Sequence, residues 1–99
     1  MAIKVMLKRV PKPGKWRELN EILIELRMLG MGHRGYISGE TLLSATDQGT
    51  TLVISQWASI NRWHEYASSP QRMTLLDKIR PLLAEPTSME IWVESPVIG

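Results

Sequence analysis

The fold is decided by residues 51–72, TLVISQWASINRWHEYASSPQR, which join a buried strand to two capped helices. The apolar run Leu52–Trp57 predicts the strand. Ser59 follows as a good N-cap for a short helix, since its side chain can accept a hydrogen bond from a free backbone N–H. Ser69 and Pro70 then predict the start of another helix, because proline is well tolerated at the first helical position.

Large side chains are concentrated in this segment. Ile60, Trp63 and Tyr66 recur at every third residue of the short helix, so they lie on or near one face. Trp57 ends the preceding strand, and Tyr66 brings a hydroxyl that a buried site has to satisfy. The cluster fits either a packed core or the wall of a small-molecule pocket, and we expect any such pocket to be built here.

Two polar residues of the same segment are open to two interpretations each. Arg72 lies one turn past Tyr66 and is either a cation at the pocket mouth or an exposed helix residue. His64 falls on the polar side of the short helix, which favours exposure to solvent, although the ordinary pKa of histidine would suit a general base.

Composition limits the class of protein. The chain has 99 residues, 43% of them hydrophobic and 22% charged, which predicts one soluble globular domain over 1–99. A net charge of +2 is too small to imply a polyanion such as nucleic acid as partner. We expect solvated surface for the basic residues near the N-terminus, Lys4, Lys8, Arg9, Lys12, Lys15 and Arg17.

Other classes are excluded by what the sequence lacks. It has no cysteine, so disulfides, thiolate nucleophiles and thiolate metal sites cannot form. No apolar run is long enough to span a membrane, and the N-terminal stretch lacks the apolar centre of a signal peptide. We expect a cytoplasmic protein that does not bind a membrane.

The N-terminal half predicts a strand, a helix and a hairpin. Alternating Ile3, Val5 and Leu7 indicate a half-buried strand. A helix over about 15–29 follows, with Gly30 and Gly32 as stops and a buried stripe of Trp16, Leu19, Ile22, Leu23 and Leu26. The runs 36–44 and 51–57 flank Asp47 and Gly49, which favours an antiparallel hairpin.

The C-terminal half predicts two helices and a strand. A short helix is expected at about 60–67 and a longer one at about 70–83, which Pro81 kinks or stops. The longer helix should bury Met73, Leu76, Ile79 and Leu83. Residues 89–93 alternate between apolar and polar or aromatic side chains, as in a last strand.

The order β-α-β-β-α-β predicts an α+β ferredoxin-like sandwich. In this fold the helices cover one face of the sheet, so residues such as Met6 and Trp92 or their neighbours lie on the other face. A second subunit would cover that face, and we expect a homodimer in which two sheets meet as an α+β barrel.

Several catalytic and binding motifs are weak or absent. Gly30-Met-Gly32-His33-Arg34-Gly35 matches G-x-G-x-x-G, but it follows a helix and precedes a strand, the reverse of a dinucleotide site. His33 and His64 have no carboxylate at metal-ligand spacing, so no metal is expected. No G-x-S-x-G surrounds a serine. The RNA-binding pattern of sheet aromatics is missing from this phenylalanine-free chain.

Four stretches resemble the antibiotic biosynthesis monooxygenase domain. They are Gly35-Tyr-Ile-Ser-Gly-Glu-Thr-Leu42, Leu52-Val-Ile-Ser-Gln-Trp-Ala-Ser59, Trp63-His-Glu-Tyr-Ala-Ser-Ser-Pro-Gln-Arg72 and Glu85-Pro-Thr87. The similarity covers nearly the whole chain in the same order of elements. It implies a dimeric α+β barrel with a pocket between sheet and helices.

The resemblance also implies a chemistry. Catalytic members bind a planar aromatic such as a quinol or anthrone and oxidise it with O2, without metal or flavin. Trp57 and Trp63 would be the aromatic walls of such a pocket, and Leu7 and Leu76 would line it at positions matched to the family's site. Tyr66 and Arg72 would position the anion.

The same match argues against two branches of the family. Haem-degrading relatives carry Asn, Trp and His at the positions of Leu7, Tyr66 and Leu76, so the haem-ligating histidine is missing here. Small-quinol members place histidines at about the positions of Tyr66 and Gln71, so their usual base is missing here. Two hypotheses follow: a cofactor-independent monooxygenase of a small phenolic or quinol-like substrate, with His64 as the remaining candidate base, or a non-catalytic small-ligand or haem-binding module.

Overall fold

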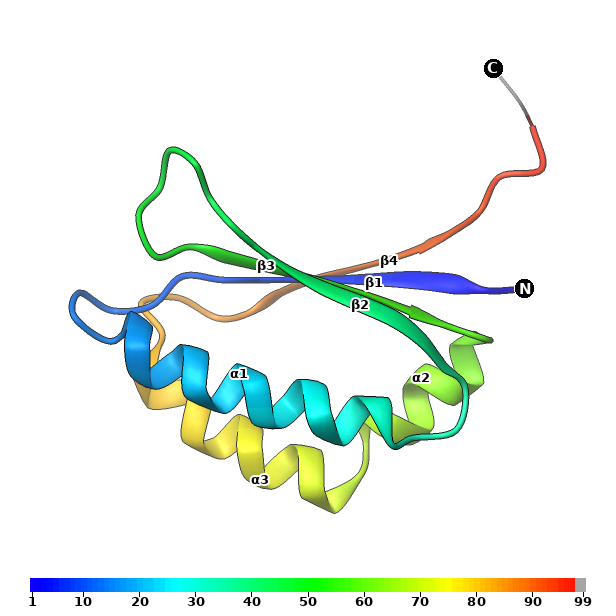
Figure 1. Ribbon diagram of the computed structural model, residues 1–99, viewed down its shortest axis with the longest axis horizontal. Helices are drawn as coiled ribbons and strands as arrows, with labels where there is room; N and C mark the ends of the chain where they lie inside the picture. The colour runs from blue at the N-terminus through cyan, green and yellow to red at the C-terminus, as the bar shows by residue number, and fades with distance from the viewer. Residues whose placement is uncertain (98–99) are drawn as a thin grey trace.

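The computed structural model describes residues 1–97, which form a four-stranded sheet and a layer of helices (Figure 1). In chain order the elements are β1 (Ile3–Arg9), α1 (Trp16–Met31), β2 (Tyr36–Leu43), β3 (Thr51–Trp57), α2 (Ile60–Ala67), α3 (Pro70–Ile79), the 3₁₀-helix η1 (Arg80–Leu82) and β4 (Ser88–Val93). The expected order of strands and helices is confirmed.

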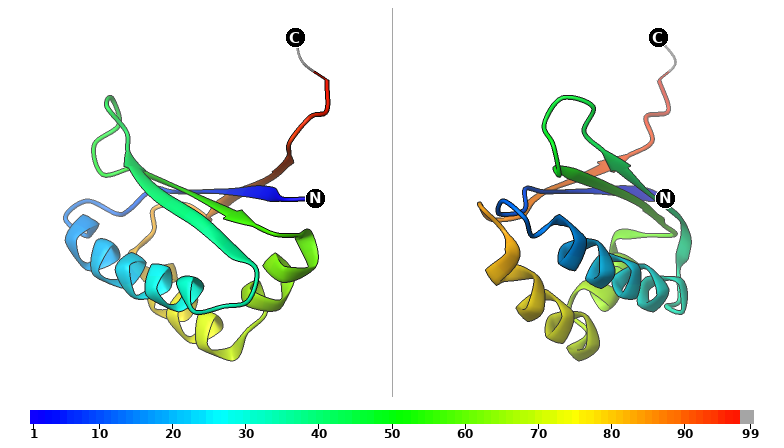
Figure 2. Two further views of the ribbon diagram at one scale, coloured as in Figure 1. Left: turned by 45° about the vertical axis from the view of Figure 1, so that its right-hand side comes forward. Right: turned by 60° about the vertical axis from the view of Figure 1, so that its left-hand side comes forward.

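The sheet is antiparallel, with strand order β2-β3-β1-β4. The first and last strands of the chain therefore lie side by side, and all three α-helices lie on the same side of the sheet (Figure 2). The ferredoxin-like α+β fold predicted from the sequence is confirmed.

The buried face of the sheet carries one half of the core. Ile3, Val5 and Leu7 of β1 point toward the helices and pack with Trp57, Trp63 and Tyr66. A second cluster joins α1 to α3 and η1 through Leu19, Leu23, Leu26, Ile79, Leu82 and Leu83. Burial of these side chains supplies the main driving force for folding.

The caps of α2 and α3 are those that the sequence predicts. Ser59 Oγ accepts a hydrogen bond from the Arg62 backbone N–H at 3.2 Å, and Ser69 Oγ accepts one from the Arg72 N–H at 3.3 Å. Pro70 is the first residue of α3. The helix expected over 70–83 ends earlier, at Ile79, because Pro81 carries no N–H and the chain tightens into η1.

Three expectations about burial and helix ends are wrong. Trp16 is 36% exposed, because it begins α1 and lies over Gly49 of the β2–β3 loop instead of in the core. Met73 is 41% exposed, since α3 turns Arg72 inward in its place. Gly30 does not stop α1: it lies inside the helix against Tyr66, and Gly32 is the C-cap.

The end of β1 is tied to the segment before β4. The Lys12 N–H donates to the Leu82 carbonyl at 2.8 Å, and the Ala84 N–H donates to the Val10 carbonyl at 2.8 Å. An isolated β-bridge between Pro11 and Leu83 lies between these bonds. We call this pairing of residues 10–12 with 82–84 the rim clasp.

The other face of the sheet has no helix over it (Figure 1). The strand register places Met6, Ile54 and Leu52 on this face, beside Leu42 and Trp92, which are 44% and 55% exposed. Lys4, Lys8, Glu40 and Glu90 share the face with them. Within residues 1–97, no helix is long and apolar enough to cross a membrane.

Candidate functional site

Aromatic rings from β2, β3 and α2 form one packed cluster. Trp57 and Tyr66 are stacked, with ring centroids 4.9 Å apart and planes inclined by 22°. Trp63 and Tyr36 meet Trp57 edge-on at 5.8 and 5.4 Å. The Trp57 indole N–H donates to Ser55 Oγ at 3.0 Å, so this buried ring leaves no unsatisfied donor.

The Tyr66 hydroxyl joins α2 to α1. It donates a hydrogen bond to the Leu26 carbonyl oxygen at 3.0 Å in a buried environment, and its ring end lies against Gly30. The His33 ring meets the same tyrosine edge-on at 5.1 Å. Burial raises the pKa of Tyr66, and the positive charge of Arg72 partly opposes that shift.

Arg72 is buried inside the protein instead of exposed on its helix. Its guanidinium carbon lies 5.1 Å from the centre of the Trp63 ring and 5.5 Å from that of Tyr66, within the range of cation–π interactions. One guanidinium nitrogen donates to the Ala67 carbonyl at 3.2 Å and so caps the last turn of α2. Burial lowers the pKa of Arg72.

Arg9 is a second buried arginine, which the sequence analysis placed on the solvated surface. It is 1% exposed, because it is the last residue of β1 and follows Ile3, Val5 and Leu7 on the inward face. Burial and the nearby charge of Arg72 lower its pKa from the ordinary value of arginine to about 10. The signal was present in the sequence, since Arg9 continues the period-2 pattern of the strand.

One nitrogen of the buried Arg9 side chain has no hydrogen-bond partner in the described part of the chain. Among residues 1–97, the buried side-chain nitrogen and oxygen atoms without a hydrogen-bond partner are Arg9 Nε and Thr51 Oγ1. These two residues are direct partners across β1 and β3. The ion pairs found in the described part of the chain are Lys15–Glu18, Arg62–Glu65 and Arg80–Asp77, so neither Arg9 nor Arg72 has a carboxylate partner there.

Two cavities lie between the sheet and the helices. A small one of about 50 Å³ is bordered by the aromatic cluster and α1. A large one of about 580 Å³ lies between α3, η1, the segment 83–87 and the ends of β1 and β4. Leu7, Arg9 and Arg72 line both cavities, and we call these three residues the shared wall.

The structure brings most of the predicted site residues to these cavities. Trp57, Trp63 and Tyr66 line the small cavity, and Leu76 lines the large one. Leu7 and Arg72 belong to the shared wall. The candidate residues from strand and helices are therefore together, but the aromatic rings lie behind Arg72 and not around the larger space.

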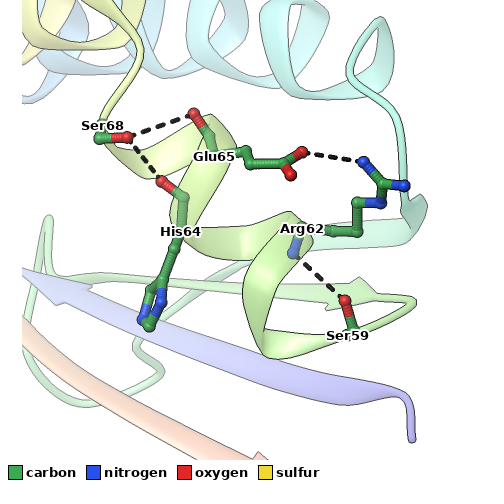
Figure 3. A network of polar contacts seen from close by, with 5 residues as sticks. All are labelled: Ser59, Arg62, His64, Glu65 and Ser68. Carbon is green, nitrogen blue, oxygen red and sulfur yellow. Dashed lines mark hydrogen bonds and ion pairs between the residues drawn. The ribbon is translucent and has the colours of Figure 1, made fainter.

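His64 is the predicted residue that lies elsewhere. Its side chain is exposed and lines neither cavity. Its backbone carbonyl accepts a hydrogen bond from Ser68 Oγ at 2.8 Å, in a polar network with the Arg62–Glu65 pair on the surface of α2 (Figure 3). Residues 1–97 also contain no group of three His, Asp or Glu side chains placed to hold a metal ion.

Comparison with known proteins finds relatives through structure. No protein-family model and no curated protein matches the sequence. Rv0793 from Mycobacterium tuberculosis superposes with a TM-score of 0.88 at 17% identity, over 100% of both chains. An antibiotic biosynthesis monooxygenase superposes with a TM-score of 0.87 at 14% identity, over 95% of this chain and 99% of the other.

A third structure has a described activity. SnoaB, a cofactor-independent oxygenase from Streptomyces nogalater, superposes with a TM-score of 0.86 at 9% identity, over 98% of this chain and 96% of its own. The chain therefore has the fold of the antibiotic biosynthesis monooxygenases along its whole described length. The resemblance seen in the sequence is confirmed at the level of the fold.

Proposed function

We propose that this protein is a cofactor-independent monooxygenase that oxidises a small phenolic, quinol-like or anthrone-like substrate with O2. The observation that carries the proposal is the shared wall, where two buried arginines that form no ion pair within residues 1–97 line a cavity of about 580 Å³. Ligand pockets of small molecules are typically about 300–1,000 Å³ in volume. The oxygenase SnoaB has the same fold, which supports this choice of reaction class.

The substrate ring fits the large cavity better than the small one. A cavity that binds benzene measures about 150 Å³, whereas the space beside the aromatic cluster is about 50 Å³. We therefore place the ring between α3 and β4, with Leu76, Ile79 and Met89 as apolar walls. The inner edge of the ring then faces Arg72.

The reaction needs an anionic substrate. A phenolate or enolate beside Arg72 is stabilised by the positive charge, and its first proton leaves to solvent water. The anion gives one electron to O2, and the resulting substrate radical and superoxide combine to a hydroperoxide. Loss of water leaves a carbonyl group, so a ring CH2 and O2 give C=O and H2O, and the substrate supplies all four electrons.

The protein contributes position and charge to these steps. Trp63 and Tyr66 hold the guanidinium of Arg72 from behind, and the Tyr66 hydroxyl bond to Leu26 fixes the ring that Arg72 contacts. Because His64 lines neither cavity, the proposal assigns it no proton transfer. Trp57 is a packing partner of Tyr66 in this scheme.

The test is oxygen consumption by the purified protein with no flavin or metal added. Hydroquinones, naphthoquinols and anthrones are the substrate panel, and with ¹⁸O2 the new carbonyl of an anthrone-type product should carry the label. Arg72→Met should lower the rate at least tenfold, whereas Arg17→Met, which removes an exposed arginine, should not change it. Uptake no faster than autoxidation for every compound would contradict the proposal.

A second candidate is a binding module without catalysis. It is favoured by the position of His64 outside both cavities, which leaves the exposed Glu85 as the acidic side chain at the large cavity. No histidine lines either cavity, so the described residues suit a small organic ligand better than haem. Ligand binding without oxygen uptake would assign the protein to this class.

We also propose that the protein is a single domain that assembles as a homodimer through the uncovered face of the sheet. The apolar residues Met6, Ile54 and Trp92 on that face support the assembly. Lys4, Lys8, Glu40 and Glu90 carry both signs of charge on the same face, as a self-complementary contact requires.

A further inference from the structure

The shared wall contains more positive charge than a phenolate needs. Arg9 is 1% exposed and Arg72 is 7% exposed, and both residues line the same two cavities. Buried charges in proteins are normally paired, because removing a charge from water without a partner is costly. Over residues 1–97, neither arginine forms an ion pair.

Local bonding confirms that donors are left over. Arg72 uses one N–H on the Ala67 carbonyl, and Arg9 Nε has no partner within the described chain. The Thr51 hydroxyl, next to Arg9 across the strands, is also without one. More than 90% of buried polar groups in proteins find a partner, so two orphans on adjacent residues indicate a missing acceptor.

The position of Arg72 adds to the positive potential. It lies in the first turn of α3, where the helix dipole is already positive and a cation is unfavourable. Glu85 lines the large cavity, but it is exposed and is not within ion-pairing distance of either arginine. The protein therefore keeps two cations in its interior without a carboxylate partner among the described residues.

We propose that the natural ligand carries a permanently ionised oxyanion, a carboxylate or a phosphate, which Arg9 and Arg72 bind at the shared wall. Guanidinium groups suit such ions, since their planar N–H donors match the oxygen atoms in pairs. The organic part of the ligand extends from there into the large cavity. The inference rests on the proposed function in placing the substrate in this cavity, and it names the charge that the substrate brings.

Binding without turnover tests the inference. Calorimetric titration compares 2-naphthoate, 2-naphthyl phosphate and the neutral 2-naphthalenemethanol, which share one ring system. We expect at least one anion to bind tenfold or more tightly than the alcohol, and the tighter of the two identifies the oxyanion. Equal affinity for all three, or no binding of either anion up to its solubility limit, overturns the inference.

The variants separate a ligand-binding role from a packing role. Arg9→Met should abolish the advantage of the anion and leave the alcohol unaffected, whereas Arg17→Met should keep the advantage. Without ligand, the melting temperature of Arg9→Met should be no lower than that of the native protein, because an unpaired buried charge has been removed. If Arg9→Met binds the anions as the native protein does, the inference fails.

Oxygen uptake provides an independent check on the proposed function. Hydroquinone and 2,5-dihydroxybenzoate form a matched pair of quinols that differ in a carboxylate. Anion binding without uptake of O2 by any compound supports the charge assignment and rejects the oxygenase. Uptake that is equally fast with both quinols rejects the charge assignment and keeps the oxygenase.

Discussion

At the scale of single residues, the burial of Arg9 is expected to cost stability. Its lowered pKa means that the charged form is less favourable in the folded protein than in the unfolded chain. The penalty is fully present below about pH 10 and is relieved as pH rises from there toward the ordinary pKa of arginine. At about 1.36 kcal/mol per pKa unit, the shift corresponds to a penalty of roughly 3 kcal/mol.

We therefore expect Arg9→Met to raise the free energy of unfolding near neutral pH by about 1–3 kcal/mol. The difference between variant and native protein should shrink above pH 10, where the folded native protein loses the proton. Urea unfolding at neutral pH and above pH 10 measures both values, with Arg17→Met as the exposed control. A variant that is less stable than the native protein near neutral pH would contradict this account of Arg9.

Tyr66 should act as a positioning residue. Tyr66→Phe keeps the ring on which Arg72 lies but removes the hydroxyl that donates to the Leu26 carbonyl. We expect about 1 kcal/mol less stability. Turnover should fall more than binding, because loss of the link between α2 and α1 loosens the geometry that the transition state needs.

Steady-state kinetics and titration of the bound ligand measure the two effects separately. Tyr66→Leu is the matched variant, because it removes the ring as well as the hydroxyl. It should also weaken anion binding about tenfold, since Arg72 loses a cation–π contact. Equal losses of turnover and binding in Tyr66→Phe would assign the hydroxyl no role in positioning.

Site residues differed in how well the sequence predicted them. Trp57, Trp63 and Tyr66 were expected at a pocket because they cluster in one capped segment, whereas the sequence left Arg72 open between a pocket cation and an exposed helix residue. Arg9 was missed because a basic residue among other basic residues was assigned to the surface, although its place in the β1 alternation points inward. Met73 was placed inward for the converse reason: an apolar residue was preferred over its charged neighbour Arg72.

At the scale of elements, the cap of α3 connects folding to the site. Ser69 Oγ accepts a hydrogen bond from the N–H of Arg72, so the cap also fixes the backbone of the arginine that we propose binds the anion. Ser69→Ala should cost about 1 kcal/mol of stability and weaken anion binding severalfold. Ser59→Ala removes the equivalent cap of α2, and its stability loss should be similar with binding unchanged.

Thermal unfolding and ligand titration of the two variants test this difference directly. Weakened binding in both variants, or in neither, would contradict a specific link between the cap of α3 and anion binding.

The helices and strands themselves were well predicted, because caps and hydrophobic periods are local signals. The end of α3 was predicted only approximately: Pro81 indicates a stop, but the residue at which the helix tightens into η1 also depends on packing of Leu82 and Leu83 against α1.

At the scale of the whole molecule, the uncovered face of the sheet makes the oligomeric state the main prediction. Ile54→Lys places a charge at the middle of this face, and we expect it to convert the proposed dimer to a monomer. Light scattering with size-exclusion chromatography gives the mass. Ile24→Lys is the control, because Ile24 is 53% exposed on α1 and should leave the mass unchanged.

A native protein of monomeric mass, or a dimer that survives Ile54→Lys, would contradict assembly through this face.

The topology could be predicted from the sequence, because the hydrophobic patterns of strands and helices follow one another in a fixed order, and few arrangements of the sheet are compatible with that order. The volume and position of the cavities could not. They depend on how far α3 lies from β4, which is set by packing between residues distant in the chain.

The rim clasp borders the large cavity, because its residues Leu83 and Ala84 also line that cavity. Its two backbone hydrogen bonds tie the end of β1 to this wall. The amide protons of Lys12 and Ala84 should therefore exchange with solvent deuterium at one common rate, as a cooperative opening unit. A ligand that contacts Leu83 and Ala84 should slow both amides equally, so two backbone bonds at the rim would report whether the cavity is occupied.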